Sequence, residues 1–545
     1  MFWNHFAGKR LILPLLLITF TFVGCIASLR PGLTVDDATE QKTFRVITTA
    51  AKSLLSGRLD EYNRIKLYHD RYYGIGFDLM AYPFQVLLQP SVASRLNVDE
   101  ETALLLARRP PLFLLFAISV VAFYRHARWF THRPIAVAAS AAYATCPYLF
   151  GHAMINLRDS PFMAVYLICT YLSLRLVKRH LAGRINSYGP DVVGLALATA
   201  TLVSIRIPGF MILVQYTFTF ALAAYCKRDV TNTGLFRWQN LASFSVVLLL
   251  LVVLLFPAVW LNPLPEIFAG MKYVGWFYQP GCTLTWGECM EPHASVGYLW
   301  RWLAVKLPVT VLIGIVCIPL MLKRIWRDPF HRIAYLTLLF GSVYVLIVII
   351  PLRARLYDET RQLLFIYPLL FLLAFIAIYL VSRKLVLVAA VLTVGIFCWD
   401  QARLYPYQYV YFNEFGRFLD IDSLFETDYW GISAREHARV LQADSRFMTG
   451  LTCLYADPVD LYRPFIDPNT CLRPLDALTA YQSRNGIVAY QSRNGTVVAI
   501  TCSPSNRFRF KAPPTCWQIA SITRKLPLSN RVVTMSAAYY CSPLQ

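Results

Sequence analysis

Two adjacent carboxylates, Asp36 and Asp37, follow the first apolar segment of the chain by about eight residues. Neighbouring carboxylates repel each other, which favours proton uptake by one of them. A carboxylate at a membrane surface can take a proton from an acceptor hydroxyl or amine, as a general base does. The pair also suits the first turn of an interfacial helix, where carboxylates stabilise free N–H groups. The sequence alone leaves both roles open.

A second group of polar residues lies in the short segment 151–160, between two apolar segments. It contains His152, Asn156, Arg158 and Asp159, and Pro161 then follows at a position typical of a helix start. Asp159 or Ser160 could cap that helix. Four polar groups are more than one cap requires, so this segment is also predicted to contribute to a site.

Arginines mark two further positions at the ends of apolar segments. Arg206 lies in a short turn between two such segments, and the segment 353–361 contains three arginines together with Tyr357 and Asp358. A guanidinium can hold two phosphate oxygens at once. Neither position requires a phosphate ligand. Arg206 could instead extend its side chain to the membrane surface, and the arginines of 353–361 could contact lipid headgroups.

An aromatic-rich stretch covers residues 405–413 and 425–433. Tyrosine and tryptophan gather at membrane interfaces, and an aromatic belt accounts for most of this composition. It does not account for Glu426 and Asp428, which are therefore further candidates for substrate contacts.

The elements that must position these residues follow from the composition. Of 545 residues, 57% are hydrophobic and 15% charged, and the mean hydropathy is +0.47. A soluble protein carries roughly 25% charged residues. The composition therefore excludes an ordinary soluble enzyme and intrinsic disorder, and it indicates a polytopic membrane protein.

Eleven apolar segments approach the length of about 20 residues that a membrane-spanning helix needs. They cover about 11–28, 104–124, 134–150, 161–177, 191–205, 207–226, 241–260, 306–322, 334–352, 362–381 and 385–399. The first segment could be a signal peptide, but residues 27–30 make a poor cleavage site, so a retained anchor is predicted.

Basic residues determine the predicted orientation. They cluster after the second, fourth, sixth, eighth and tenth segments, which the positive-inside rule places in the cytoplasm. The N-terminus is then cytoplasmic and the C-terminal part extracytoplasmic. The net charge of +21 lies mostly in these blocks, because residues 400–545 carry only 15 basic and 12 acidic residues. This distribution argues against a nucleic-acid partner.

The predicted organisation is a transmembrane domain over residues 1–399 and an extracytoplasmic C-terminal domain over 400–545, small and of α/β or β-rich type. The outer loops of the first domain are 29–103, 151–160, 261–305 and 353–361. Short β-like runs occur at 495–502 and 531–541, and a nine-residue sequence is repeated in tandem over 480–497. Two copies are too few for a solenoid, so we interpret the repeat as a local duplication.

Seven of the 13 cysteines fall in the predicted outer parts, where disulfides can form. Cys282 and Cys289 are predicted to pair and close a short loop. The remaining five allow at most two bridges among themselves: Cys453, Cys471, Cys502, Cys516 and Cys541. No CxxC pair supports zinc.

The candidate residues all lie on one predicted side of the membrane, above wide apolar walls. Such a site suits a substrate that is part lipid and part anionic sugar phosphate. A proton-coupled transporter would carry acidic residues within its spans, and the eleven apolar segments have none in their cores. No Walker A, HExxH or GxSxG motif occurs.

Four motifs, in chain order, resemble those of the C-type (GT-C) glycosyltransferases, in the bacterial branch of the protein O-mannosyltransferase and aminoarabinose-transferase group. They are Val35-Asp36-Asp37, with Asp in place of the family's usual Glu, and segments 152–161, 357–361 and 426–431. The resemblance covers about residues 1–435. It implies an all-α polytopic GT-C-like fold of about eleven transmembrane helices.

The resemblance further implies inverting transfer of a hexosyl or pentosyl group from a polyprenyl-phosphate donor to a lipid, glycan or protein acceptor. Asp36 is then the general base, Asp37 and Asp159 orient the acceptor or a metal, and Arg206 and Arg361 hold the donor phosphate. The other residues expected to bind substrate are His152, Asn156, Arg158, Tyr357, Asp358, Glu426 and Asp428. Members of the family differ in whether a divalent metal takes part in the reaction. The cofactor is therefore left open, and no metal ligand is assigned.

Two other classes of function remain open. One is a lipid-linked sugar flippase or exporter without transfer chemistry, and the other is a channel-like or scaffolding membrane protein. Neither inverted repeats nor broken helices are evident in the sequence, although alternating-access transporters often use them. A flippase should tolerate Asp36→Asn, whereas an inverting transferase should not. The predicted location is a bacterial cell inner membrane.

Overall fold

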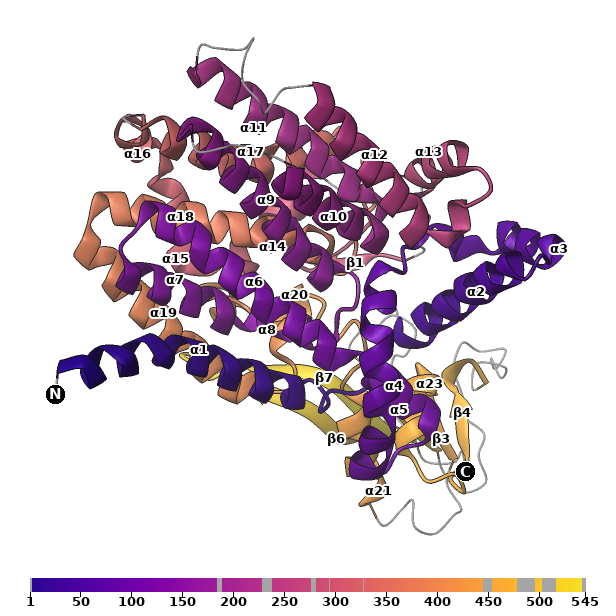
Figure 1. Ribbon diagram of the computed structural model, residues 1–545. Coiled ribbons are helices and arrows are strands. Elements are labelled where there is room, and N and C mark those ends of the chain that lie inside the picture. Colours follow the sequence, from indigo (N-terminus) through magenta and orange to yellow (C-terminus); the bar gives the residue numbers. More distant parts are fainter. Residues whose placement is uncertain are drawn as a thin grey trace.

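The computed structural model describes residues 2–183, 189–227, 238–275, 281–293, 295–326, 328–444, 453–477, 496–501 and 516–541. The tandem repeat over 480–497 lies almost entirely outside the described residues. Helices form most of the chain, and a small sheet lies at one end of the helix bundle (Figure 1).

All eleven predicted apolar segments are helical, but their lengths differ. Within the described ranges, seven helices are long and apolar enough to cross a membrane, and a bent pair would make an eighth. The protein is therefore a multi-pass membrane protein. The helices of the bundle are α1 (Phe2–Ala27), α6 (Arg109–Phe130), α7 (Arg133–Thr145), α8 (Pro147–Ile155), α9 (Asp159–Leu181), α10 (Gly189–Ile205), α11 (Ile212–Lys227), α12 (Trp238–Leu255), α14 (Val296–Lys306), α15 (Val309–Val316), α16 (Ile318–Ile325), α17 (Pro329–Ile349), α18 (Tyr367–Val381) and α19 (Arg383–Leu404).

Two predicted spans are broken. The segment 134–150 divides at Cys146 into α7 and α8, and the segment 306–322 includes the join between α14 and α15, which bend by 117°. Pro147 and Pro308 occupy these breaks. Proline supplies no N–H and disfavours helical geometry in the residue before it, so an unbroken helix is unfavourable at both positions.

The helices differ in how far neighbours surround them. In the apolar stretch Arg361–Val381, which ends with α18, 78% of the most apolar window is buried inside the protein, whereas in α12 the share is 11%. An apolar helix that is mostly uncovered by protein must face lipid. Helices α15 and α18 approach closely at Gly314, where an added Cβ would lie 2.5 Å from the Cβ of Ala374.

The predicted first outer loop is largely helical, and its α2 and α3 project from the side of the bundle (Figure 1). The loop contains α2 (Asp37–Leu55), α3 (Leu59–Asn63), η1 (Arg64–Leu67), η2 (His69–Tyr72), α4 (Gly76–Leu96) and α5 (Glu100–Leu106). The predicted loop 261–305 contains α13 (Pro263–Gly275) and a hairpin of β1 (Thr283–Thr285) and β2 (Glu288–Met290).

The C-terminal part contains a five-stranded sheet of order β4-β3-β5-β7-β6. Its strands are β3 (Cys453–Asp457), β4 (Leu472–Pro474), β5 (Thr496–Thr501), β6 (Cys516–Lys525) and β7 (Val532–Cys541). Strand β3 pairs in parallel with β4 and β5, while β7 pairs antiparallel with β5 and β6. Both predicted β-like runs are therefore strands. The predicted domain boundary at 399/400 falls inside α19.

Helix α21 (Ala434–Gln442), α4 and α5 pack their apolar residues against this sheet, where Val92 and Leu106 share a cluster with Leu454 and Val497. Three disulfides occur among the described residues: Cys282–Cys289, Cys453–Cys471 and Cys516–Cys541. The predicted hairpin bridge is confirmed, and two tail bridges form. Cys502 lies outside the described residues.

Candidate functional site

The segments predicted to lie on one side of the membrane meet at one end of the bundle. Asp36 precedes α2, Asp159 begins α9, and Arg206 lies between α10 and the short helix η3 (Ile207–Met211). Arg361 begins η6 (Arg361–Ile366), and Trp430 lies before α21. The charged residues of these segments and their neighbours form two groups, which differ in composition and exposure.

The first group, which we term the closed cluster, consists of three acids and three arginines: Asp37, Glu40, Asp78, Arg108, Arg109 and Arg158. The Asp37 carboxylate lies 3.0 Å from Arg108 Nη2 and 3.2 Å from Arg109 Nη2. It also accepts a hydrogen bond of 2.7 Å from the Thr34 backbone N–H. Both arginine side chains are fully buried.

Arg158 completes the closed cluster. Its guanidinium lies 3.1 Å from Glu40 Oε1 and 3.2 Å from Asp78 Oδ2, and it donates to the Gly74 carbonyl. Burial raises the pKa of Glu40 to about 7, although the charges of Arg158 and Arg108 act in the opposite direction. Because every charge in this cluster has an opposite partner, we interpret it as the support of the first loop.

The second group, which we term the open cluster, consists of Asp36, Asp159, Arg206, Asp358 and Arg361. Asp159 is buried and holds two guanidiniums from separate segments of the chain. Its Oδ1 accepts from Arg206, and its Oδ2 lies 3.3 Å from Arg361 Nη1. The Arg206 side chain is 27% exposed. The two arginines predicted to hold phosphate thus lie side by side.

Asp36 has a different environment from its neighbour Asp37. It occupies the position before α2, but its side chain makes no capping bond to that helix. Its Oδ2 accepts a hydrogen bond of 3.0 Å from the Trp430 indole N–H. Among the residues that the structure describes, no Arg, Lys or His nitrogen is found within 4.0 Å of its carboxylate. Asp36 is therefore a half-buried carboxylate without a cation in direct contact.

The other charges of the open cluster lie close enough to interact with Asp36. Burial raises the pKa of Asp358, the charge of Arg361 lowers it, and the negative charge of Asp36 raises it further. Burial also raises the pKa of Tyr73, with a smaller contribution from Asp36. Carboxylates from two separate loops, Asp36 and Asp358, therefore lie near Arg361.

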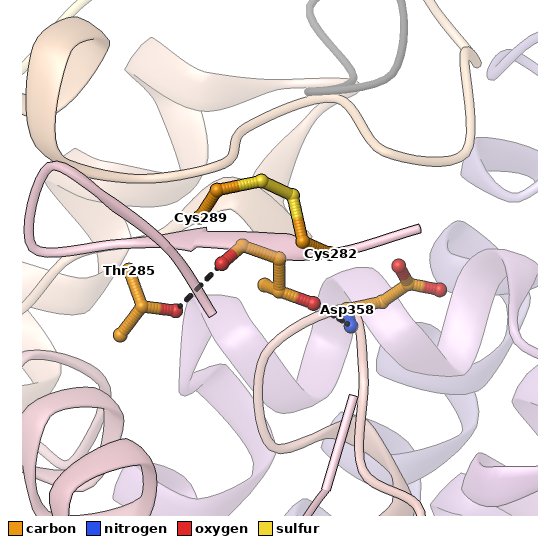
Figure 2. The surroundings of a disulfide bond; sticks show 5 residues. Cys282, Thr285, Cys289 and Asp358 are labelled. Carbon is orange, nitrogen blue, oxygen red and sulfur yellow. Dashed lines mark hydrogen bonds between the residues drawn. A yellow bond between two sulfur atoms is a disulfide. The ribbon is translucent and has the colours of Figure 1, made fainter. Parts of the chain in front are cut away.

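The disulfide-closed hairpin β1–β2 supports two of the site segments (Figure 2). The backbone N–H of Asp358 donates to Thr283 Oγ1 at 3.1 Å, and the N–H of Glu426 donates to the Leu284 carbonyl at 3.0 Å. Asp358 and Glu359 both have positive φ angles, of 53° and 68°. These uncommon conformations bring the loop before Arg361 into contact with the hairpin.

A cavity of about 360 Å³ adjoins the open cluster. Its polar lining includes Arg206, Tyr73, Tyr357 and Arg355. The apolar lining comes mainly from η3, α17, the residues after α17 and η6, and it includes Ile207, Phe210, Met211, Val345, Val348, Ile349, Leu352, Leu356, Leu363 and Phe365. The cavity can therefore accept a ligand with an anionic head and an apolar chain.

The remaining predicted residues mostly support the backbone. Asn156 Oδ1 accepts from the N–H groups of Arg158 and Asp159 at 3.1 and 2.8 Å, and its amide donates to Asp159 Oδ2 at 3.1 Å. It thus caps α9 and orients Asp159. His152 is fully buried against the Trp430 ring, and burial lowers its pKa well below the usual range, so it is neutral.

Asp428 and Glu426 are buried in the loop that carries Trp430. Asp428 accepts hydrogen bonds of 3.0 Å from both the Ile432 and Ser433 N–H groups and one of 2.5 Å from the Tyr409 hydroxyl. It therefore fixes the turn of this loop. Glu426 lies beside the hairpin through its backbone N–H.

Several site residues were absent from the sequence prediction. The closed cluster contains Asp78, Arg108 and Arg109, and Trp430 is the partner of Asp36. A fully buried pair, Lys306 and Glu359, lies 2.7 Å apart and connects the end of α14 to the loop before Arg361. The sequence signal was the position of Arg108 and Arg109 within an apolar segment, where an unpaired charge is costly.

A divalent metal needs several ligands that converge on one point. Among the described residues, no group of three or more His, Cys, Asp or Glu side chains lies close enough to hold an ion. The acids Asp37 and Asp159 each lie between two arginines, which would repel a cation. These residues therefore do not fit a divalent metal.

No family model and no curated protein sequence matches the chain. Solved structures similar to it include ArnT from Cupriavidus metallidurans bound to undecaprenyl phosphate, at 13% identity and a TM-score of 0.43, covering 96% of this chain and 98% of that one. The apo state of the same ArnT shows 12% identity and a TM-score of 0.44, covering 99% of this chain and 100% of that one. The Archaeoglobus fulgidus oligosaccharyltransferase in the apo form shows 11% identity and a TM-score of 0.42, covering 86% of this chain and 61% of that one.

ArnT, an aminoarabinose transferase, belongs to the group whose motifs this sequence resembles. The identities and TM-scores are too low to transfer the role of any residue.

Proposed function

We propose that the protein is a membrane glycosyltransferase that moves a sugar from a polyprenyl-phosphate donor to an acceptor on the extracytoplasmic face of the inner membrane. The observation that carries the proposal is the open cluster. Asp36, whose carboxylate contacts no cation among the described residues, shares a site with two arginines at the side of a cavity that is largely apolar. A base, a phosphate-binding pair and a place for a lipid chain thus lie together.

The donor would bind with its phosphate near Arg206 and Arg361 and its isoprenoid chain in the cavity. Arg206 and Tyr357 line that cavity, and Tyr357 lies under the Arg361 guanidinium, 4.9 Å from ring centroid to the guanidinium carbon. Two guanidiniums held by one buried aspartate are already oriented before the phosphate arrives. Preorganised charge of this kind stabilises a leaving group without further rearrangement.

The proposed reaction is a single displacement, which inverts the anomeric centre. Asp36 takes the proton of an acceptor hydroxyl or amine while the acceptor atom bonds to the anomeric carbon. The bond between that carbon and the phosphate oxygen breaks, and its electron pair remains on the phosphate, where the two arginines stabilise the added charge. This reaction requires no covalent intermediate between the sugar and the protein.

The contacts of Asp159 and Asp37, the two other acids predicted to be catalytic, indicate a supporting role for each. Asp159 would act as a positioning residue, because it holds Arg206 and Arg361 rather than facing an acceptor. Asp37 would support the segment that carries Asp36, through Arg108 and Arg109.

The test begins with the lipid that copurifies with the protein, identified by mass spectrometry and then supplied to the purified protein in nanodiscs. Asp36→Asn should reduce transfer by about 10²–10⁴-fold, the usual contribution of a general base. Binding of undecaprenyl phosphate, used as the probe for the donor head and chain, should be unchanged. Asp60→Asn, an exposed carboxylate in α3, is the matched control and should transfer normally.

Full transfer by Asp36→Asn would reject the assignment of the base. A parent protein that moves a lipid-linked sugar across the bilayer without attaching it to an acceptor would instead identify a flippase. In that case Asp36→Asn should leave translocation intact.

A further inference from the structure

The indole of Trp430 contacts both an acid and an arginine of the open cluster. Its N–H donates to Asp36 Oδ2 at 3.0 Å, and the Arg361 guanidinium carbon lies 5.1 Å from its ring centroid. Trp430 is 2% exposed. It therefore links the proposed base to one of the two arginines proposed to bind phosphate.

The surroundings fix the position of this indole. The ring packs at 76° against His152, with 5.4 Å between centroids, and it also packs against Tyr409 and Tyr429. Gly431, which follows it, has a φ of 70°, a conformation that favours glycine. The Asp428 carboxylate holds the next turn of the loop through the N–H groups of Ile432 and Ser433.

The backbone beside Trp430 is also bonded to the segment that carries Asp36. The Val35 N–H donates to the Trp430 carbonyl at 3.2 Å, and the Gly32 N–H donates to the Ile432 carbonyl at 3.1 Å. An added Cβ at Gly32 would lie 2.4 Å from that same Ile432 oxygen, so the two segments are in close contact. The geometry of Asp36 relative to Trp430 is thus set by backbone and side chain together.

Asp36 needs such a support more than Asp37 does. Two arginines and a backbone N–H hold the Asp37 carboxylate, whereas the indole is the one side chain found to hydrogen-bond Asp36 in the described ranges. The indole N–H engages Oδ2, which leaves Oδ1 to accept a proton. A catalytic group must be held near its productive geometry by neighbours that are themselves locked.

We propose that Trp430 is a positioning residue: it fixes the Asp36 carboxylate for proton removal and keeps the Arg361 guanidinium in register with it. This inference rests on the proposed function and goes beyond it by assigning the alignment of base and leaving-group site to one side chain. Trp430 takes no proton and contacts no reacting atom.

The indole N–H and the ring can be removed separately. Trp430→Phe keeps a ring beside Arg361 but removes the N–H, so kcat should fall about ten- to a hundredfold, as expected for a hydrogen bond to a charged group. The KM for donor and the Kd for undecaprenyl phosphate should change less than about twofold. Trp430→Leu removes the ring as well, and should also weaken undecaprenyl phosphate by about two- to thirtyfold, the range for a lost cation–π contact.

Trp260→Phe is the matched control, because the half-buried Trp260 also donates its N–H, to the Val253 carbonyl of α12 at 2.7 Å, and contacts no carboxylate of the open cluster in the described residues. It should leave kcat unchanged. Thermal unfolding of each variant reports any loss of structure. The residual rate of Asp36→Asn should not fall further in the double variant with Trp430→Phe, because the N–H then has no base to position.

The outcomes distinguish this inference from the function on which it rests. An inactive Asp36→Asn together with a fully active Trp430→Phe overturns the role of Trp430 and leaves the base in place. A fully active Asp36→Asn overturns the base itself. Multiplicative losses in the double variant, or a lowered melting temperature that accounts for the lost rate, would mean that Trp430 acts on the fold rather than on Asp36.

Discussion

The closed and open clusters differ in how their charges are matched, although they begin at adjacent residues. In the closed cluster, three acids contact three arginines, and the Arg108 and Arg109 side chains are fully buried. In the open cluster, Arg206 is 27% exposed and lines a cavity, and within the described part of the chain the Trp430 indole is the one side chain that hydrogen-bonds Asp36. Buried charges that satisfy one another support structure, while an incompletely matched charge beside a cavity is available for a substrate.

The largest effect should come from separating the two adjacent acids. Asp36→Asn should lose about 10²–10⁴-fold in transfer rate while retaining the parent's stability, since no ion pair is broken. Asp37→Asn should do the reverse: it leaves Arg108 and Arg109 without their shared partner and should cost about 3–5 kcal/mol of stability. Thermal unfolding and single-turnover rates, measured on both variants, give the comparison.

If Asp37→Asn unfolds like the parent and is inactive, Asp37 belongs to the chemistry, and the division between the two clusters is wrong at this residue. Asp60→Asn again serves as the control for a change of charge on the same loop.

The next effect concerns the arginines of the open cluster. Arg361→Ala and Arg206→Ala should each weaken undecaprenyl phosphate by roughly ten- to a hundredfold, because a contact to a charged group contributes about 1.5–3 kcal/mol. Arg→Lys should restore part of the affinity, since lysine offers a point charge in place of a planar fork. Titration in nanodiscs measures both changes. Unchanged affinity in the two alanine variants would place the phosphate elsewhere, with Arg158, Arg353 and Arg355 as the next residues to test.

A smaller effect is expected for Asp159→Asn. The amide still reaches Arg206 and Arg361 but no longer neutralises them, so the arginines should be less well ordered. We expect undecaprenyl phosphate affinity to fall by a few-fold, about 1 kcal/mol, the size of an ordinary hydrogen-bond contribution. A loss as large as that of Arg361→Ala would mean that Asp159 does more than position the pair.

The smallest effect is a pH dependence that belongs to the closed cluster. Burial raises the pKa of Glu40 from 4.5 to about 7. The folded protein therefore keeps the Glu40 proton to a higher pH than the unfolded chain does. Between about pH 4.5 and 7 the unfolded state binds fewer protons, so this contribution to stability is present at low pH and is lost as pH rises through 7.

Glu40→Gln should flatten the decline of the melting temperature between pH 5 and 8. Part of the decline should remain, because burial also raises the pKa of Glu359 to about 7. Glu101→Gln, an exposed acid in α5, is the control. An unchanged pH dependence in Glu40→Gln would show that Glu40 is ionised throughout this range.

Sequence reasoning selected Asp36, Asp159, Arg206 and Arg361 as candidates because charges at the ends of apolar segments are costly unless they are used. It could not assign their partners. Asp37 and Arg108 are 71 residues apart, and nothing local distinguishes Asp37 from Asp36. Which of two adjacent acids meets an arginine depends on how α2 packs against the start of α6.

The fold shows the same limit. Apolar length identified most helices of the bundle, although α14 fell almost entirely within the predicted outer loop 261–305. The turn-rich tail indicated strands. Both inferences depend on local composition. The breaks at Pro147 and Pro308 were missed because hydropathy does not register a lost backbone donor. The cysteines gave the hairpin pair by proximity, whereas the tail bridges depend on the order of strands in the sheet.

The distance along the chain between Asp36 and Trp430 has a consequence for how the protein is made. The two residues are 394 positions apart, so Asp36 leaves the ribosome long before its partner exists. The loop of Trp430 is in turn held by β7, through the bond from Thr427 Oγ1 to the Thr534 carbonyl. A growing chain in the membrane thus contains the proposed base without its support, and transfer competence should arise only after β7 has been made.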